Sequence, residues 1–267
     1  MIGDPSTDRP LALVTGATAG LGRVFAQRLA ARGHDLVLVA RDGARLEQTG
    51  RDLAAAHGVA VEAFPADLSL DPDVTRLISR LGETRGLAVL VNNAGFGTVG
   101  PLASTPREPQ AAMLHLHVLA PMRLAQASLP GMLARRSGAI INVSSIAAFV
   151  YAPGSVNYCA SKAYLTVFSE GLATELVGSG VRVQALCPGF THTEFHQRMG
   201  GGSAPVRRRG PWLSAEYVVD ASLAAIDRGG PVVCIPSLRY RLIVGLVRLI
   251  PRRLLGFLAR TRPAGPG

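Results

Sequence analysis

Short apolar runs alternate along this chain with longer segments whose apolar residues recur every three or four positions. The longer segments predict amphipathic helices; in one of them Leu21, Val24, Phe25 and Leu29 share a face, and Gly33 ends the helix. The short runs predict buried strands at 11–14, 35–39, 59–64, 87–91, 139–141, 181–186 and 232–235. Strands and helices that alternate in this way predict an α/β fold with a doubly wound, parallel, seven-stranded sheet of the Rossmann-like type.

Further helices are predicted between these strands, at 42–57, from Asp71 onward, at 107–134 with an interruption at Pro121, up to Val177 and at 214–228. Residues 190–212 follow neither periodicity and predict a long loop. Loops of this length inside a compact domain are usually functional lids.

The alternating pattern fits one domain over residues 1–237, because no internal repeat and no linker interrupts it. Residues 238–267 form an arginine-rich amphipathic tail. Its apolar stretch, Leu242 to Ile250, is far shorter than the roughly 20 residues of a membrane-spanning helix. Two alternatives remain for the tail: it lies at a membrane surface with its arginines facing anionic head groups, or it packs on its own domain or across a dimer.

Charge and cysteine content narrow the class of protein. The net charge is +10, but seven arginines and no acid fall in the last thirty residues, so the excess belongs to the tail rather than to a nucleic-acid-binding face. Cys159, Cys187 and Cys234 are too few and too scattered for a disulfide framework or a metal site. The first ten residues contain no apolar run and predict no signal peptide. We therefore expect a cytoplasmic protein that binds neither nucleic acid nor metal.

A glycine-rich turn, TGATAGLG at residues 15–22, follows the first strand and opens the first helix. Glycines in this context let the backbone approach a pyrophosphate, which is held at the N-terminus of the helix. The alternative is a glycine-rich turn that binds no ligand. We favour a dinucleotide site.

The end of the second strand indicates which dinucleotide binds. An acid at this position usually reads the ribose of NAD, but Val39 and Ala40 offer no carboxylate. Arg41 offers a guanidinium suited to a 2′-phosphate, with Arg45 and Arg23 nearby in sequence, although Asp42 follows directly. The sequence therefore favours NADP(H) over NAD(H).

A serine, a tyrosine and a lysine follow the fifth predicted strand. Tyr158 and Lys162 are four residues apart and therefore share one face of a helix, while Ser145 comes from the end of the strand. A tyrosine hydroxyl has a pKa of roughly 10, and a nearby ammonium group favours its ionised form. We therefore expect Lys162 to lower the pKa of Tyr158, and Ser145 to hydrogen-bond the substrate oxygen on which Tyr158 acts. The alternative is a tyrosine and a lysine that only share a helix face.

With TGATAGLG, NNAG at 92–95, Ser145, YCASK at 158–162 and CPGFTHT at 187–193 in this order, the chain resembles the short-chain dehydrogenase/reductase family. The resemblance spans about 11–236. It implies that Tyr158 is a general acid or base, that Ser145 binds the substrate carbonyl, and that Lys162 assists. It also implies a set of cofactor-binding residues: Gly16, Thr18, Ala19, Gly20, Leu21, Gly22, Arg41, Asp67, Leu68, Asn93, Ala94, Gly95, Tyr158, Lys162, Pro188, Gly189 and Thr193.

The chain departs from the family at one position. The family usually has an asparagine twenty-eight residues before the serine, where this chain has His117. That asparagine is thought to shape a water relay to the lysine, so His117 is a further candidate catalytic residue. Pro121 has no N–H to donate to the carbonyl of His117, so we expect this carbonyl to lack a helical partner and to point towards Lys162.

We therefore expect an NAD(P)-dependent oxidoreductase that transfers hydride between a carbonyl and a secondary alcohol. The alternative, raised by His117, is a regulator or scaffold that binds the nucleotide with little turnover. A hydrophobic substrate is favoured by the candidate pocket residues, which are apolar or aromatic: Phe96, Phe149, Tyr151, Phe190, Phe195 and Trp212. The resemblance also implies a homodimer or homotetramer.

Overall fold

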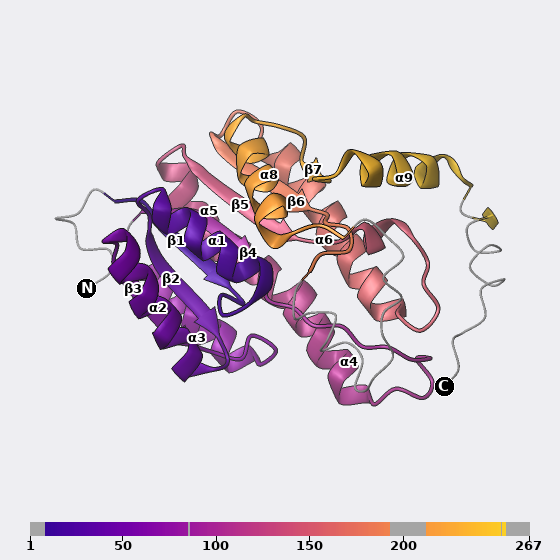
Figure 1. Cartoon of the computed structure of the whole chain (residues 1–267), viewed down its shortest axis with the longest axis horizontal. Helices are drawn as coiled ribbons and strands as arrows, with labels where there is room; N and C mark the ends of the chain where they lie inside the picture. The colour runs from indigo at the N-terminus through magenta and orange to yellow at the C-terminus, as the bar shows by residue number, and fades with distance from the viewer. Residues whose placement is uncertain (1–8, 85, 193–211, 252, 255–267) are drawn as a thin grey trace.

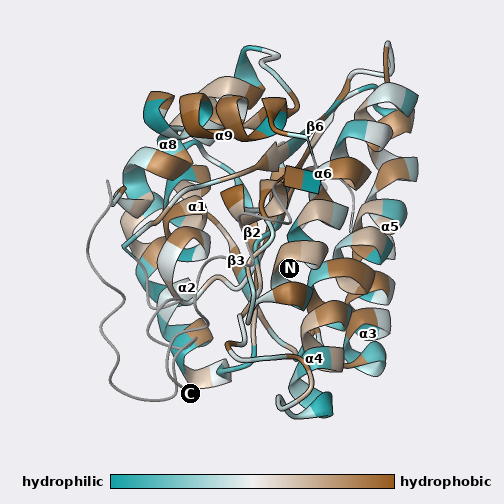
Figure 2. Ribbon diagram, turned by 90° about the vertical axis from the view of Figure 1, so that its right-hand side faces the viewer, coloured by the Kyte–Doolittle hydropathy of each residue, from teal (hydrophilic) through white to brown (hydrophobic). Residues whose placement is uncertain are grey.

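The computed structural model of the chain describes residues 9–84, 86–192, 212–251 and 253–254. These residues form a central sheet covered by helices on both sides (Figures 1 and 2). Within the described part of the chain, no helix combines the length and the apolar character needed to cross a membrane.

The sheet has seven strands in the order β3-β2-β1-β4-β5-β6-β7, and all neighbouring pairs are parallel. The strands are β1 Leu11–Thr15, β2 Asp35–Ala40, β3 Val61–Pro65, β4 Leu87–Asn92, β5 Gly138–Val143, β6 Val181–Leu186 and β7 Val233–Cys234. The predicted doubly wound, Rossmann-like sheet is confirmed. The predicted bounds of β6 agree with the structure, and those of the other strands differ by one or two residues at an end. At β5, Gly138 and the polar Asn142 extend the pairing beyond the apolar run.

Each face of the sheet carries its own helices. One face packs against α1 Gly20–Ala31, α2 Gly43–His57 and α8 Ala215–Asp227, and the other against α3 Asp71–Gly82, α5 Ala120–Ala134 and α6 Val156–Glu175. Figure 2 shows the two layers on either side of the strands. The strands supply both cores because their side chains alternate between faces: Ala12 and Val14 join the first core, and Leu11 and Leu13 the second.

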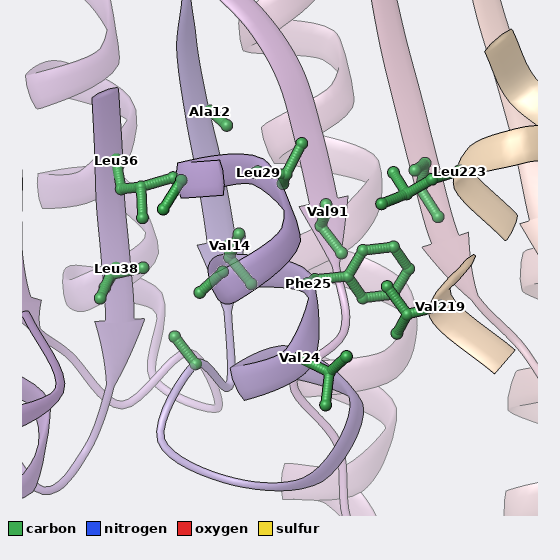
Figure 3. Packing of buried hydrophobic residues seen from close by; sticks show 14 of the residues in the cluster. Ala12, Val14, Val24, Phe25, Leu29, Leu36, Leu38, Val91, Val219 and Leu223 are labelled. Carbon is green, nitrogen blue, oxygen red and sulfur yellow. The ribbon is translucent and has the colours of Figure 1, made fainter. Parts of the chain in front are cut away.

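Phe25 of α1 occupies the centre of the first core. Its ring is fully buried and lies among residues of α1, β4 and α8, including Leu29, Val91, Val219 and Leu223 (Figure 3). This packing fixes the start of α1 against the strands β1 and β4. The glycine-rich turn between β1 and α1 is therefore held from both ends.

The predicted long helix 107–134 is interrupted, as the position of Pro121 predicts. It consists of α4 Arg107–Leu114, a single π-helical turn at His115–Leu119, and α5, in whose first turn Pro121 lies. Proline cannot donate a backbone hydrogen bond, and wider π turns often occur at functional sites. The turn contains His117, which is buried.

The chain beyond β7 begins with a helix, α9 Leu238–Leu249, at the edge of the molecule (Figure 1). Tyr240 and Val244 on this helix are buried against Ala185, Cys187 and Ile235. Part of the predicted tail therefore packs on its own domain, which was one of the two alternatives. The division of the chain at residue 237 stays a prediction.

Candidate active site

The candidate site lies at the carboxyl ends of β1, β4, β5 and β6. From β1 the chain winds outward through β2 to β3, then returns to place β4 on the other side of β1. This reversal leaves the ends of β1 and β4 without a crossover helix above them, which is where doubly wound sheets bind their ligands.

Thr15 and Asn93 join the two strand ends at this point. The Thr15 hydroxyl accepts hydrogen bonds from the backbone N–H groups of Asn93 and Ala94, both at 2.9 Å. In return, the Asn93 amide donates to the carbonyl of Thr15 at 2.8 Å and to that of Gly16 at 3.3 Å. The Asn93 side chain therefore holds the turn in position from beneath.

Two of the glycines in the turn are required by geometry. Gly16 has a φ of +67°, which favours glycine, and a Cβ there would lie 2.8 Å from the Asn93 amide nitrogen. A Cβ on Gly22 would lie only 2.2 Å from the carbonyl oxygen of Gly16. The first turn of α1 can pack this closely on the loop only because both residues lack side chains.

The N-terminus of α1 is suited to an anionic group. Its N-cap residue, Ala19, offers no side-chain hydrogen bond to the first N–H groups of the helix, and the first turn contains no acid. Free N–H groups and the positive end of the helix dipole together favour a phosphate. With the close-packed glycines, this observation fits the pyrophosphate of a dinucleotide.

Arg41 and Asp67 mark the outer end of the site, at the ends of β2 and β3. The Arg41 side chain is 69% exposed, and its guanidinium lies 3.9 Å from the carboxylate of Asp67. In the sequence, the acid Asp42 weakens the case for an NADP site. In the structure, Asp42 is the N-cap of α2 and accepts a hydrogen bond from the backbone N–H of Arg45 at 3.0 Å. Its carboxylate therefore has a structural role as a helix cap.

Ser145, Tyr158 and Lys162 are brought together where β5 ends and α6 passes. Ser145 caps a short 3-10 turn, η2 Ile146–Phe149, by accepting from the N–H of Ala147 at 3.1 Å. Lys162 is 4% exposed, and its ammonium group donates to the carbonyl of Val143 at 2.9 Å. The same ammonium nitrogen lies 5.7 Å from the centre of the Tyr158 ring.

Burial determines the protonation of Tyr158 and Lys162. Loss of hydration raises the pKa of Tyr158 to about 12, although a hydrogen bond with Ser145 opposes part of the rise. Loss of hydration likewise lowers the pKa of Lys162 to about 8. The prediction that Lys162 lowers the pKa of Tyr158 is therefore wrong: the pKa is raised, burial of the hydroxyl is the largest cause, and Lys162 is not among the groups that shift it. At neutral pH Tyr158 is a neutral phenol able to donate a proton, and Lys162 is a cation.

His117 connects the loop after β4 to helix α6. Its Nε2 accepts a hydrogen bond from the backbone N–H of Phe96 at 3.2 Å, and its Nδ1 lies 3.0 Å from the hydroxyl of Ser161. Since the Ser161 hydroxyl donates to the carbonyl of Tyr158 at 2.8 Å, the imidazole proton is assigned to Nδ1, which donates to Ser161. Burial, and then the Lys162 charge, hold the pKa of His117 well below its usual value, so the ring is neutral.

The rings of His117 and Tyr158 meet edge to face, with centres 5.9 Å apart. A Cβ on Gly95 would lie 2.7 Å from Nε2 of His117, so the imidazole and the glycine occupy adjoining space. His117 therefore faces the candidate site. The expected freedom of its backbone carbonyl stays a prediction.

Sequence reasoning missed several polar residues that support this site. Ser144 donates to the carbonyl of Lys162 at 2.8 Å, and its hydroxyl also lies 2.8 Å from that of Thr166. The hydroxyl groups of Thr15 and Ser161 each make two of the hydrogen bonds described above. Ser144 and Ser161 directly precede Ser145 and Lys162 in the sequence, and this position was the only sign of their role. Position in the sequence alone does not show which way a side chain points.

Pro188 and Gly189 follow β6 and border the site beside η2. The carbonyl of Pro188 accepts from the N–H of Ile146 at 3.1 Å. A Cβ on Gly189 would lie 2.0 Å from the Tyr240 ring, whose hydroxyl accepts from the N–H of Phe190. Helix α9 therefore packs directly on the loop after β6.

Two of the residues expected at the site, Thr193 and Phe195, lie outside the described residues. The other cofactor-site residues expected from the sequence follow β1 (Gly16 to Gly22), β2 (Arg41), β3 (Asp67 and Leu68), β4 (Asn93 to Gly95) and β6 (Pro188 and Gly189), whereas Tyr158 and Lys162 lie on α6. Among the described residues no group of three or more His, Cys, Asp or Glu side chains is arranged to hold a metal ion.

A doubly wound sheet with a glycine cradle and a Ser-Tyr-Lys group defines a dinucleotide-binding protein of the oxidoreductase type. The profile described as short chain dehydrogenase matches residues 10–202, and the chain belongs to this family. Family members are NAD(P)-dependent oxidoreductases, as the resemblance implied.

Relatives of this chain include enzymes that act on carbonyl compounds. A very-long-chain 3-oxoacyl-CoA reductase of Pyrenophora tritici-repentis is 31% identical over 82% of this chain and 64% of the fungal protein, so the chain matches less than two thirds of that relative. An uncharacterised oxidoreductase of Myxococcus xanthus is 40% identical over 69% of this chain and 73% of its own length.

Among solved structures, a short-chain dehydrogenase of Sphingobium yanoikuyae in complex with NADPH has a TM-score of 0.81 and 36% identity, covering 97% of this chain and 98% of its own. A bulky-bulky ketone specific alcohol dehydrogenase of Comamonas testosteroni has a TM-score of 0.77 and 31% identity, covering 98% of both chains. A Burkholderia phymatum member of the family was solved with NAD, at 27% identity and a TM-score of 0.78, covering 97% of this chain and 98% of its own. These neighbours support a nicotinamide cofactor without deciding between its two forms.

The contacts of His117 lead to a prediction for two variants. His117→Asn keeps a side-chain donor near the position of Nδ1, so we expect turnover to change only a few-fold. His117→Leu removes both hydrogen bonds and leaves the N–H of Phe96 without its acceptor, which costs about 1–3 kcal/mol. Turnover of a carbonyl substrate should therefore fall about tenfold more in the leucine variant, with circular dichroism as the control for folding. Equal turnover in the two variants would show that these hydrogen bonds do not position the site.

Proposed function

We propose that this protein is an NADP(H)-dependent oxidoreductase that transfers hydride between the nicotinamide and a carbonyl or secondary alcohol of a hydrophobic substrate. The observation that carries the proposal is the meeting of Ser145, Tyr158 and Lys162 at the strand ends beside the glycine cradle. A cradle alone fits any nucleotide-binding protein. A buried tyrosine with a cationic neighbour, at the same edge of the sheet, is suited to proton transfer.

The cofactor would be held by the turn after β1 and the N-terminus of α1 for its phosphates, and by Lys162 and the loop after β6 at its nicotinamide end. Arg41 supports a 2′-phosphate because its guanidinium is exposed and because Asp42 is engaged as a helix cap. The bound cofactor supplies the hydride chemistry, and the protein supplies position, a proton and electrostatic stabilisation.

Tyr158 would donate its phenolic proton to the substrate oxygen as negative charge develops there. Its raised pKa of about 12 means that the proton is present at neutral pH. Ser145 would hydrogen-bond the same oxygen, and the Lys162 cation would stabilise the tyrosinate left behind. A protonated Tyr158 beside a cationic Lys162 is therefore suited to donate the proton that reduction of a carbonyl requires.

The neighbours support a hydrophobic substrate, since one is a bulky-bulky ketone specific alcohol dehydrogenase and one relative is a very-long-chain 3-oxoacyl-CoA reductase. Among the candidate pocket residues, Tyr151 and Phe190 are 52% and 43% exposed, and Phe190 lies 5.6 Å from the Trp212 ring between centres. Exposed aromatic surface is suited to an apolar substrate.

The second function considered, a regulator that binds the nucleotide with little turnover, rests on His117. The imidazole makes two hydrogen bonds and packs on Tyr158, so it supports the arrangement around the tyrosine. This observation favours the enzyme. We propose further that the protein is a cytoplasmic homodimer or homotetramer.

Replacing the proton donor tests the proposed function directly. Tyr158→Phe should lower turnover of a carbonyl panel with NADPH by about 10²–10⁴-fold, as loss of a general acid does. NADPH binding, followed by its fluorescence, should change little because the phenol acts on the substrate. Tyr164→Phe on the same helix is the matched control, since this exposed ring stacks on Phe168, and it should retain activity. Turnover within a few-fold of the parent in Tyr158→Phe would exclude the proposed acid.

The protonation of Lys162 predicts a pH dependence. Its pKa is lowered to about 8, so the cation is present below this pH and is lost as the pH rises through it. We expect the rate of carbonyl reduction to fall about tenfold per pH unit above about 8, measured as kcat between about pH 6 and 10. A rate that stays constant to pH 10 would show that the lysine charge is not required.

The charge of Arg41 predicts the cofactor preference. The unmodified protein should bind NADPH more tightly than NADH, and Arg41→Asp should reduce that preference by about one to two decades. Arg51→Asp, an exposed charge reversal on α2, is the control and should leave the preference unchanged. The preference is measured as the ratio of the dissociation constants of the two cofactors, obtained by fluorescence titration. Equal affinities in the unmodified protein would refute the NADP(H) proposal.

A further inference from the structure

Helix α9 carries apolar residues on two opposite sides. Tyr240 and Val244 are 3% and 5% exposed and face the domain. Successive residues of a helix turn by about 100°, so Leu238, Leu242, Leu246 and Leu249 lie together on the side directly away from them. These four leucines are 68%, 62%, 65% and 80% exposed, and we call them the α9 leucine face.

This arrangement is unusual for a surface helix. Such a helix ordinarily has one apolar side towards the core and one polar side towards water. Single exposed leucines need no explanation, but four on one face of a twelve-residue helix form a continuous apolar surface. Figure 2 shows α9 lying across one end of the molecule with hydrophobic residues along it.

Arginines flank the α9 leucine face. Arg241 and Arg248 lie to one side of it and Arg239 to the other, and no acidic residue follows Asp227 in the sequence. Arg241 donates from Nε to the carbonyl of Ile235 at 2.6 Å, and the Arg248 guanidinium lies 4.6 Å above the Phe149 ring. These contacts, with the burial of Tyr240 and Val244, hold α9 in a fixed rotation that keeps the leucines outward.

We propose that the α9 leucine face docks in the plane of an anionic lipid bilayer, with its leucines among the acyl chains and its arginines at the head groups. A helix of this length cannot span a bilayer but can lie in its interface, where apolar burial and attraction to anionic lipid add. A second copy of the chain fits less well, because a symmetric pairing of this face would bring the same arginines together.

The proposed docking places the candidate site beside the bilayer. Helix α9 packs on η2, which directly follows Ser145, and on Gly189 of the loop after β6. A hydrophobic substrate dissolved in the bilayer would therefore lie close to the catalytic group. This last step rests on the proposed function, whereas the docking itself does not.

Co-sedimentation of the full-length protein with vesicles tests the docking. The unmodified protein should pellet with vesicles of phosphatidylcholine and phosphatidylglycerol at low salt, and less with phosphatidylcholine alone or in about 0.5 M NaCl. Leu242→Ser with Leu246→Ser should weaken binding to the anionic vesicles by about tenfold or more. The matched control is Leu102→Ser with Leu133→Ser, two exposed leucines elsewhere (53% and 42%), which should bind as the parent does.

Two results would overturn the proposal: an unmodified protein that stays in the supernatant at low salt, or a Leu242→Ser, Leu246→Ser variant that binds as well as the control variant. If sedimentation velocity shows that this variant loses a dimer that the parent forms, and neither binds vesicles, the face belongs to a second copy of the chain. Binding needs no cofactor and no turnover, so its failure leaves the proposed function standing. Conversely, a protein that binds vesicles but reduces no carbonyl would refute only the proposed function.

Discussion

The reciprocal hydrogen bonds between Thr15 and Asn93 are the constraint on which the rest of the site depends. They join two strands that are neighbours in the sheet but are separated in the chain by two strands and three helices. The Asn93 amide also fills the space beneath Gly16 and Gly22, so the shape of the glycine turn follows from a residue far away in sequence. A dinucleotide cradle is thereby built from backbone, and its rigidity comes from buried side-chain bonds.

The catalytic side of the site is held by a second set of buried polar contacts. Ser144, Lys162 and Thr166 bond to one another or to backbone carbonyls, and His117 links the loop after β4 to α6 through Ser161. A buried cation is expensive unless its hydrogen bonds are made, so the carbonyl of Val143 is needed to keep Lys162 in place. Burial destabilises the charged form of Lys162, and burial of Tyr158 likewise keeps the proton on its hydroxyl. A protonated tyrosine is suited to be a proton donor.

Much of this structure could be predicted from the sequence, because apolar periodicity and strand-end motifs depend on local order alone. The alternation of strands and helices gives the doubly wound sheet, and the spacing of Tyr158 and Lys162 places them on one helix face. The protonation of Tyr158 could not be predicted, since it depends on how deeply the hydroxyl is buried. The link from His117 to Phe96 and Ser161 was equally hidden, because it joins three segments whose proximity exists only after folding.

The contact between Tyr240 and Gly189 gives the C-terminal region a structural role next to the candidate site. Helix α9 supplies the Tyr240 ring that supports the loop after β6, and the hydroxyl of this tyrosine accepts from the N–H of Phe190. Shortening the chain before α9 would uncover Ile146 and Phe149 directly behind Ser145 and leave that loop without its support. The C-terminal helix and the loop after β6 therefore pack as one unit, so a change in the helix is transmitted to the residues that directly follow Ser145.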